Sequence, residues 1–368
     1  MTGVDLSLPY RVPLSWLLKH GSESVQLRSV RELAPPGQPG AEALEAAVVE
    51  SKPVHEITKR QADNGSWGGN LLGIAASVRD GIKEPGTIAQ YRRLLQLAYP
   101  KTGRAFKLAD RLLFRLLSRD DDPVLLFEFH KLARESPATE EWVRERNREA
   151  ATAALAEGGH PEDPRVRGAA HKIASAVSAF LRSPLADKPW ARTGGSTILH
   201  PEAHPPTWYS LAMLAAMPSL QRERAGFTER LGQYLSIHAP KKTYSIQVGK
   251  KLIKPSDILL GDPTEADARG HVDDIPLALH FYEQLARLGM LAGSPLGAKV
   301  LTRLEGERDE LGVWHPKKLT AGPKSSHRAA YHTYPLCGNT KLPDCRVADV
   351  TFRLALIAKL AGRPLEYS

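Results

Sequence analysis

The feature that most constrains this chain of 368 residues is a glycine–tryptophan segment, QADNGSWGG, in which Gln61, Gly65 and Trp67 stand at fixed offsets. A weaker echo, RDELGVW, ends in Gly312 and Trp314. Both segments lie in predicted turns beside apolar runs of helical period. Glycine permits a tight turn, and an indole buries a large apolar area. The pattern therefore predicts helix pairs, each closed by a glycine turn that a tryptophan fills.

Helical periodicity recurs along most of the chain. Residues 86–98 and 104–118 form a clear predicted pair, separated by Pro100 and Gly103. Further helices are predicted at 41–62, 206–219, 226–237, 276–289 and 295–307, and in DVTFRLALIAKLAG, which ends at Gly362. Units of about 40 residues, made of two helices and a turn, must stack or close into a ring to bury their apolar faces. We therefore expect an all-α repeat protein.

Three segments depart from this pattern. Residues 1–44 are interpreted as a lead-in and linker, because APPGQPGAE is rich in proline and glycine, and residues 45–368 as the repeat domain. Within that domain, residues 119–202 are interpreted as an insertion or an irregular part of the ring. They hold predicted helices at about 139–157 and 164–182, followed by a loop-like stretch from Trp190 to His200. Residues 241–254 alternate around Gly249 and predict a small β-hairpin.

Composition narrows the class of protein. The chain is 42% hydrophobic and 25% charged, as globular proteins are, and no window approaches the ~18 apolar residues of a membrane span. The N-terminus shows no basic start followed by a long apolar core, so we expect a cytoplasmic protein. We expect the two cysteines, Cys337 and Cys345, to be free thiols. A net charge of +9 favours an anionic partner, such as a diphosphate, nucleic acid or an acidic protein.

The spacing of Gln61, Gly65, Ser66 and Trp67 resembles the tail of the "QW" repeat of squalene and terpenoid cyclases. Those proteins share an α/α toroid with protein prenyltransferase β subunits. In the family, the glutamine ties the turn to the next helix end and the tryptophan packs on it. The resemblance implies paired antiparallel helices closed into a ring, with a hydrophobic, isoprenoid-like ligand in a central cavity. Trp67 and Trp314 are candidate ligand-binding residues.

A second segment, LTAGPKSSHRAAYHTYPLCG, resembles the prenyltransferase β-subunit stretch in which a basic loop precedes Tyr-His-Thr. The resemblance implies that His332 matches the family's zinc-binding histidine and that Asp273, in GHVDDIP, matches its aspartate. Ile275 stands where the family has a cysteine. Zinc in such an enzyme needs three protein ligands and an open position, so the set is incomplete.

Two interpretations of this region stay open. Other chemically competent ligands stand nearby in the sequence: His271, Asp274, Cys337 and Cys345. The competing interpretation is that the aspartate pair caps a helix that starts at Pro276.

Two further constellations do not match a known catalytic pattern. Asp120, Asp121 and Asp122 form the string nearest to the Asp-x-Asp-Asp acid of terpenoid cyclases, but their spacing differs and a solvated turn is expected. His200 and His204 would form a metal pair only on a helix, and the prolines between and after them argue against one.

Two lysine-rich loops are candidate anion sites. The first carries Lys241, Lys242, Lys250, Lys251 and Lys254, and the second Lys317, Lys318, Lys324 and Arg328. A diphosphate needs two or three such cations, whereas nucleic acid needs a longer stripe. The candidate ligand-binding cations are Lys250, Lys251, Lys254, Lys324 and Arg328.

Two hypotheses of function follow. In the first, a prenyltransferase-like or cyclase-like protein binds a hydrophobic ligand, such as an isoprenoid diphosphate, with Asp273, Asp274 and His332 at the cavity mouth. In the second, a non-catalytic repeat module binds nucleic acid or an acidic protein through its basic loops. A repeat fold serves both, because fold does not fix function.

Overall fold

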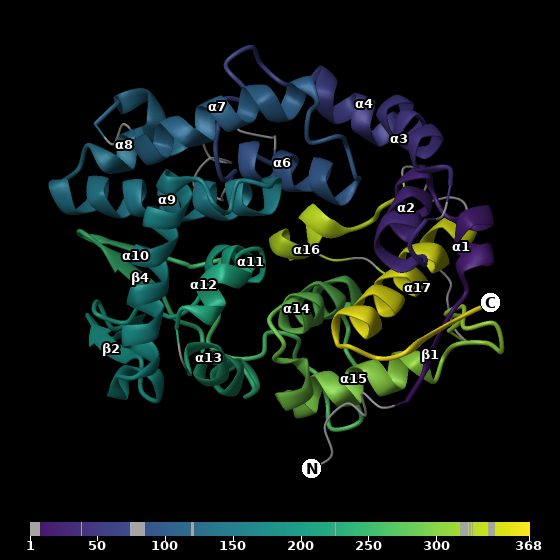
Figure 1. Cartoon of the computed structure of the whole chain (residues 1–368). Helices are drawn as coiled ribbons and strands as arrows, with labels where there is room; N and C mark the ends of the chain where they lie inside the picture. The colour runs from purple at the N-terminus through teal and green to yellow at the C-terminus, as the bar shows by residue number, and fades with distance from the viewer. Residues whose placement is uncertain are drawn as a thin grey trace.

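The computed structural model describes residues 8–37, 39–73, 85–118, 121–224, 226–316, 323, 325, 327–337 and 343–368. This part of the chain is mostly helical, with three small two-stranded sheets (Figure 1). Among the described residues, no helix has the length and apolar character that crossing a bilayer requires. The expectation of a mainly α-helical protein is confirmed.

The elements have the following bounds. The α-helices are α1 (Leu14–His20), α2 (Glu23–Arg28), α3 (Ala41–Glu50), α4 (Lys52–Lys59), α6 (Thr87–Gln96), α7 (Arg104–Ser118), α8 (His130–Ala133), α9 (Pro137–Gly158), α10 (Pro164–Leu181), α11 (Trp208–Ala215), α12 (Pro218–Arg222), α13 (Phe227–Leu235), α14 (Ile275–Arg287), α15 (Pro295–Glu305), α16 (Arg328–Thr333) and α17 (Pro343–Leu360). Short π or 3₁₀ helices are η1 (Ser29–Leu33), η2 (Pro123–Phe129), η3 (Pro184–Ala186) and η4 (Leu291–Gly293). The strands are β1 (Tyr10–Val12), β2 (Trp190–Thr193), β3 (Ser196–Leu199), β4 (Ile246–Val248), β5 (Lys251–Ile253) and β6 (Leu365–Tyr367).

Local signals place most helix ends. The Asp274 side chain accepts the backbone N–H of Leu277 at 2.8 Å and starts α14, as the capping interpretation predicted. Gly289 and Gly362, with φ of 67° and 82°, follow the ends of α14 and α17. The predicted hairpin is present as β4–β5, with Gly249 in its turn.

Two local predictions were wrong. The predicted helix at 41–62 is two helices, because Ser51 is extended (ψ 143°) and a proline follows at the start of α4. The stretch from Trp190 to His200, interpreted as a loop, contains the antiparallel hairpin β2–β3, which turns at Gly194 and Gly195. Both glycines have positive φ, which suits a tight hairpin turn.

The helices fall into two classes by burial. Every residue of α11 and all residues from Pro276 to Ala286 of α14 are buried. In contrast, α7 and α13 bury one face only. A helix that is buried all round must be enclosed by other elements. Figure 1 shows α6, α11, α14 and α17 inside α7, α10, α13 and α15.

The two ends of the described chain meet. Strand β1 pairs in parallel with β6, with Tyr10 opposite Leu365, and the Ser368 N–H donates to the Val12 carbonyl at 3.0 Å (Figure 1). Helix α17 packs on α1, α2 and η1. Residues 10–33, interpreted from sequence as part of a lead-in, are thus folded against the last helix.

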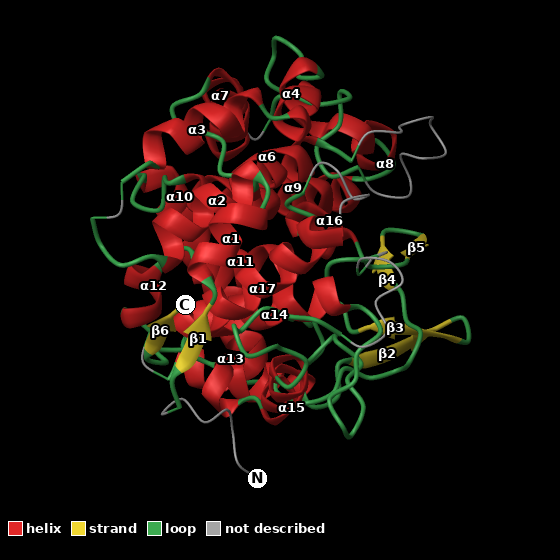
Figure 2. Ribbon diagram, turned by 90° about the vertical axis from the view of Figure 1, so that its right-hand side faces the viewer, coloured by secondary structure: helices red, strands yellow, loops and turns green. Residues whose placement is uncertain are grey.

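The segment that fits the repeat poorly contains the long pair α9 and α10. Helix α9 packs on α6, α7, α10 and α11, so it belongs to the same helical array. Beside it, the hairpins β2–β3 and β4–β5 are joined where the Leu199 N–H donates to the Ser245 carbonyl at 2.8 Å (Figure 2). The hairpins cover a second, smaller apolar core that includes Phe180, Ile246 and Val248.

Candidate functional site

Three glycine turns share one geometry. The N–H of Gly65, Gly270 and Gly312 donates to the carbonyl three residues earlier, at 2.9, 3.1 and 3.0 Å, and their φ angles are 89°, 77° and 92°. A Cβ at these glycines would lie 2.3, 2.4 and 2.7 Å from a backbone oxygen of a neighbouring element. Glycine is therefore required at each turn. The turn at Gly270 was missed in the sequence, because Val272 stands where the other two have tryptophan.

The tryptophans of the first and third turns are enclosed by protein. Trp67 is 0% exposed and Trp314 is 1% exposed. Their indole N–H groups donate to the Ile57 carbonyl at 2.8 Å and to Glu307 Oε2 at 3.0 Å. Their backbone N–H groups donate to threonine hydroxyls in α6 and α17. Both residues thus pack the turns, and neither lines the cavity described below.

The glutamine of the first turn makes the tie that the resemblance implies. Gln61 Nε2 donates to the carbonyl of Ala105, in the first turn of α7, at 2.8 Å, and to the carbonyl of Gly65 at 3.2 Å. Arg308 occupies the corresponding position before Trp314 and forms the same kind of β-bridge with it. The two turns therefore repeat the same backbone geometry, although the residue six positions before the tryptophan differs.

The residues implied for zinc do not form a ligand set. The Asp273 carboxylate is fully exposed, and its nearest described ion-pair partner is His271, at 3.7 Å. His332 is buried in α16, while Asp274 is engaged as the cap of α14. In the described ranges, no three side chains of His, Cys, Asp or Glu gather as a metal site. These residues do not fit a three-ligand zinc centre.

The cations predicted to bind an anion do not share one environment. Lys250 and Lys254 are exposed, and Lys251 forms an ion pair with Glu135. Three residues of the second basic loop, Lys317, Lys318 and Lys324, lie outside the described residues, as does Asp120. Arg328 begins α16, but its side chain is also outside the described part.

The two cysteines are bonded to each other. Cys337 and Cys345 form a disulfide with a Cα–Cα distance of 5.8 Å. The expectation of two free thiols was wrong. The short sequence separation of eight residues, with Cys345 in the first turns of α17, is what brings the two side chains together.

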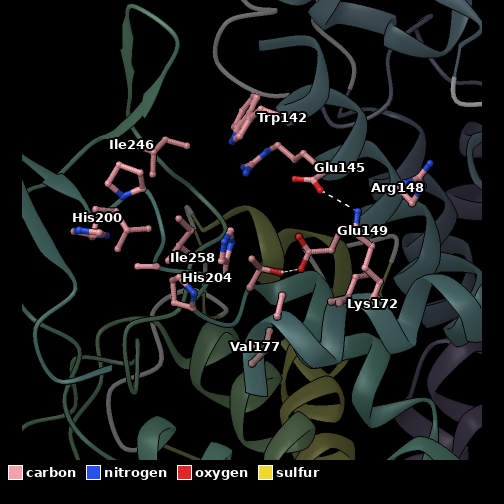
Figure 3. Close-up of a pocket in the computed structure, with 18 of the residues that line it drawn as sticks. Trp142, Glu145, Arg148, Glu149, Lys172, Val177, His200, His204, Ile246 and Ile258 are labelled. Atoms are coloured by element: carbon pink, nitrogen blue, oxygen red, sulfur yellow. Dashed lines mark hydrogen bonds and ion pairs between the residues drawn. The ribbon is translucent and has the colours of Figure 1, made fainter. Parts of the chain in front are cut away.

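A cavity of about 430 Å³ lies between α9, α10 and the segment from Leu199 to Thr207, and β4 contributes to its wall (Figure 3). Its apolar lining includes Trp142, Ile173, Val177, Leu199, Ile246 and Ile258. Its polar lining includes Glu145, Arg146, Arg148, Glu149, Lys172, His200 and His204. Figure 3 places the residues of α9 on one side and His200 and Ile246 on the other.

Helix geometry explains why α9 lines this cavity. Trp142, Glu145, Arg146 and Glu149 recur at helical spacing, so they share one face. A capping box at Ser136 begins the helix. Arg146 forms an ion pair with the buried Asp257, which ties this face of α9 to the segment before Ile258.

Glu149 is the carboxyl at the centre of this wall. Its Oε1 accepts the Thr207 hydroxyl at 2.6 Å, and Thr207 also caps α11. Burial raises the pKa of Glu149 to about 7, and the negative charge of Asp257 adds to the rise, against the Thr207 hydrogen bond and the Arg146 charge. The cavity therefore presents a carboxyl group that gains or loses its proton near neutral pH.

Sequence reasoning singled out two of these residues and missed the rest. His200 and His204 were considered as a metal pair and set aside because of the neighbouring prolines, and the structure places both on the cavity wall. Glu149 stands in the charged run EEWVRERNREA, where nothing in one sequence separates it from its neighbours. A periodicity test on α9 would have placed it on the same face as Trp142.

No family model, curated protein or solved structure matches this chain. Its function is therefore inferred from the cavity and from the turns.

Proposed function

We propose that the helices close into an α/α toroid and that the protein binds a hydrophobic small molecule in the cavity beside α9. Three features support ring closure: the pairing of β1 with β6, the two classes of helices and the three turns of one geometry. The resemblance to terpenoid cyclases and prenyltransferase β subunits implies an isoprenoid as the hydrophobic part.

The cavity is the observation that most supports a small-molecule ligand. Sites for small molecules enclose roughly 300–1,000 Å³, are mostly apolar and hold a few placed polar groups. The cavity beside α9 has a suitable volume of about 430 Å³, with aliphatic and indole side chains on its walls and Glu149 among them. It lies between α9 and α10 instead of at the centre predicted from the resemblance.

Geraniol, a ten-carbon isoprenoid alcohol, is a suitable first probe. Ligand that binds the native state at 100 times its Kd stabilises the protein by about 2.7 kcal/mol. We expect geraniol to raise the Tm of the wild-type protein and to lose this effect in Ala176→Trp, which fills the cavity from α10. Val124→Trp, at an exposed position in η2, is the matched control and should respond as the wild type does.

Two results would count against the proposal. An unchanged response to geraniol in Ala176→Trp would place the ligand elsewhere. The alternative of a non-catalytic binding module predicts no response to geraniol, together with retention on heparin that falls steeply with salt. The exposed Lys250 and Lys254 are the residues to neutralise in that case.

A further inference from the structure

The cations that line the cavity already have partners. Arg146 pairs with Asp257, and Lys172 Nζ lies 3.2 Å from Glu145 Oε1. Arg148 also has an interaction partner within the protein. An anionic ligand head group would have to compete with these contacts, because a cation paired with a carboxylate offers less net attraction to a second anion.

Glu149 differs from these residues. Its one hydrogen bond within the described chain comes from the Thr207 hydroxyl, and it forms no ion pair there. Arg146, one turn earlier on the same helix, is held by Asp257. Figure 3 shows the Glu149 carboxyl turned away from its own helix, α9, toward His204 and Ile258 on the facing wall. The cavity thus offers an acid with an unused acceptor oxygen beside apolar walls.

We propose that the ligand of this cavity carries a basic nitrogen, bound as a protonated amine by Glu149, with its apolar part against Ile173, Val177 and Ile246. The inference rests on the proposed function, because it names the head group of the same ligand. An ionised carboxylate and an ammonium group form a charge-assisted hydrogen bond, which is stronger inside a partly desolvated site than in water. A diphosphate head group, which the family resemblance implies, would instead meet the carboxyl group of Glu149.

The charged and titratable groups around Glu149 bear on any pH dependence. On α9 they are Glu145, Arg146 and Arg148; the facing elements contribute Lys172 from α10, Tyr209 from α11, Asp257, and the two imidazoles His200 and His204. Imidazole is the side-chain type in this set that ordinarily changes its charge near neutral pH. A pH series repeated in His200→Gln and His204→Gln therefore separates the imidazoles from Glu149.

Three probes with the same ten-carbon chain isolate the head group: geranylamine, geraniol and geranyl diphosphate. Calorimetric titration of the wild-type protein at pH 8 should show geranylamine binding tightest. Its affinity should rise about tenfold from pH 6 to pH 8, as Glu149 ionises. Glu149→Gln keeps the size and the Thr207 contact, and should lower geranylamine affinity by about tenfold to a hundredfold while leaving geraniol unchanged. Glu145→Gln removes a carboxylate that Lys172 already neutralises, so it should lower geranylamine affinity much less.

The outcomes separate the two proposals. If geraniol or geranyl diphosphate binds at least as tightly as geranylamine, the amine inference is overturned and the hydrophobic cavity stands. The same holds if geranylamine binds equally well to the wild type and to Glu149→Gln, or with no dependence on pH. If none of the three binds, or all bind equally to Ala176→Trp, the proposed function itself fails.

Discussion

The glycine turns and the cavity differ in how completely their polar groups are satisfied. In the turns, the indole and backbone N–H groups of Trp67 and Trp314 each have an acceptor within the protein. In the cavity, Glu149 has one described partner and a raised pKa. Buried polar groups with complete partner sets specify one packing, whereas a carboxyl oxygen without a described partner can still accept a further hydrogen bond. The turns therefore show how the chain packs, and the cavity is the place where we propose that a ligand binds.

The largest expected effect is on the turns. Trp67→Ala and Trp314→Ala each remove a fully buried indole and should lower the free energy of unfolding by about 3–5 kcal/mol, measured by urea denaturation. Trp142→Ala, at the half-buried cavity wall, should cost less stability but weaken geraniol binding. A reversal of this order would remove the distinction between the two regions.

His280 tests whether an unsatisfied polar group always marks a binding site. It is 1% exposed, stacks on Trp208, and both ring nitrogens lack a hydrogen-bond partner within the described chain, yet it does not line the cavity. Burial, with the positive charge of Arg92, lowers the pKa of His280 to about 3 from 6.5. The neutral ring suits the interior, so its charging must oppose folding.

His280 makes the free energy of unfolding depend on pH. The unfolded chain binds the proton first, so the contribution of His280 is fully present above pH 6.5 and is lost as pH falls toward 3. The slope approaches about 1.4 kcal/mol per pH unit. His280→Gln should flatten the urea-derived stability curve in this window, and an unchanged curve would contradict the assignment.

Two glycines separate backbone conformation from close approach. Gly270 and Gly289 both have positive φ, but a Cβ at Gly270 would meet the Lys299 carbonyl oxygen, whereas no atom of the described residues lies within 4 Å of one at Gly289. Gly289→Ala should lower the free energy of unfolding by about 1 kcal/mol, because alanine disfavours the positive φ and meets no other obstacle in the described part of the chain. Gly270→Ala should cost about 3 kcal/mol, because it adds an overlap with backbone. Equal losses of unfolding free energy would show that the turn at Gly270 is not packed as described.

The smallest expected effect belongs to the cavity. The pKa of Glu149 is raised to about 7 from 4.5, so its contribution is fully present below pH 4.5 and is lost as pH rises through 7. Relative to the wild type, Glu149→Gln should therefore gain stability between pH 5 and pH 8, by about 1 kcal/mol after allowance for solvent near the cavity. A difference that does not change with pH would contradict the raised pKa.

The sequence predicts the turns better than the cavity for a physical reason. Glycine and tryptophan act through local geometry, so QADNGSWGG and RDELGVW reveal two turns. One of the two open interpretations had the aspartate pair before Pro276 capping a helix, and Asp274 is the member of the pair that does so. The cavity depends on long-range contacts: Glu149 meets Thr207, and Arg146 meets Asp257, across 58 and 111 residues. No local pattern encodes such pairs. The turn at Gly270 was missed because it has no tryptophan, although its backbone geometry is the same as that of the other two turns.

The most direct test of the cavity is a crystal structure of the protein with geranylamine at pH 8. We expect density for the ligand between α9 and α10, its nitrogen within hydrogen-bond distance of Glu149 and its chain against Ile173 and Val177. Density for the ligand in another part of the molecule, with this cavity empty, would contradict the account.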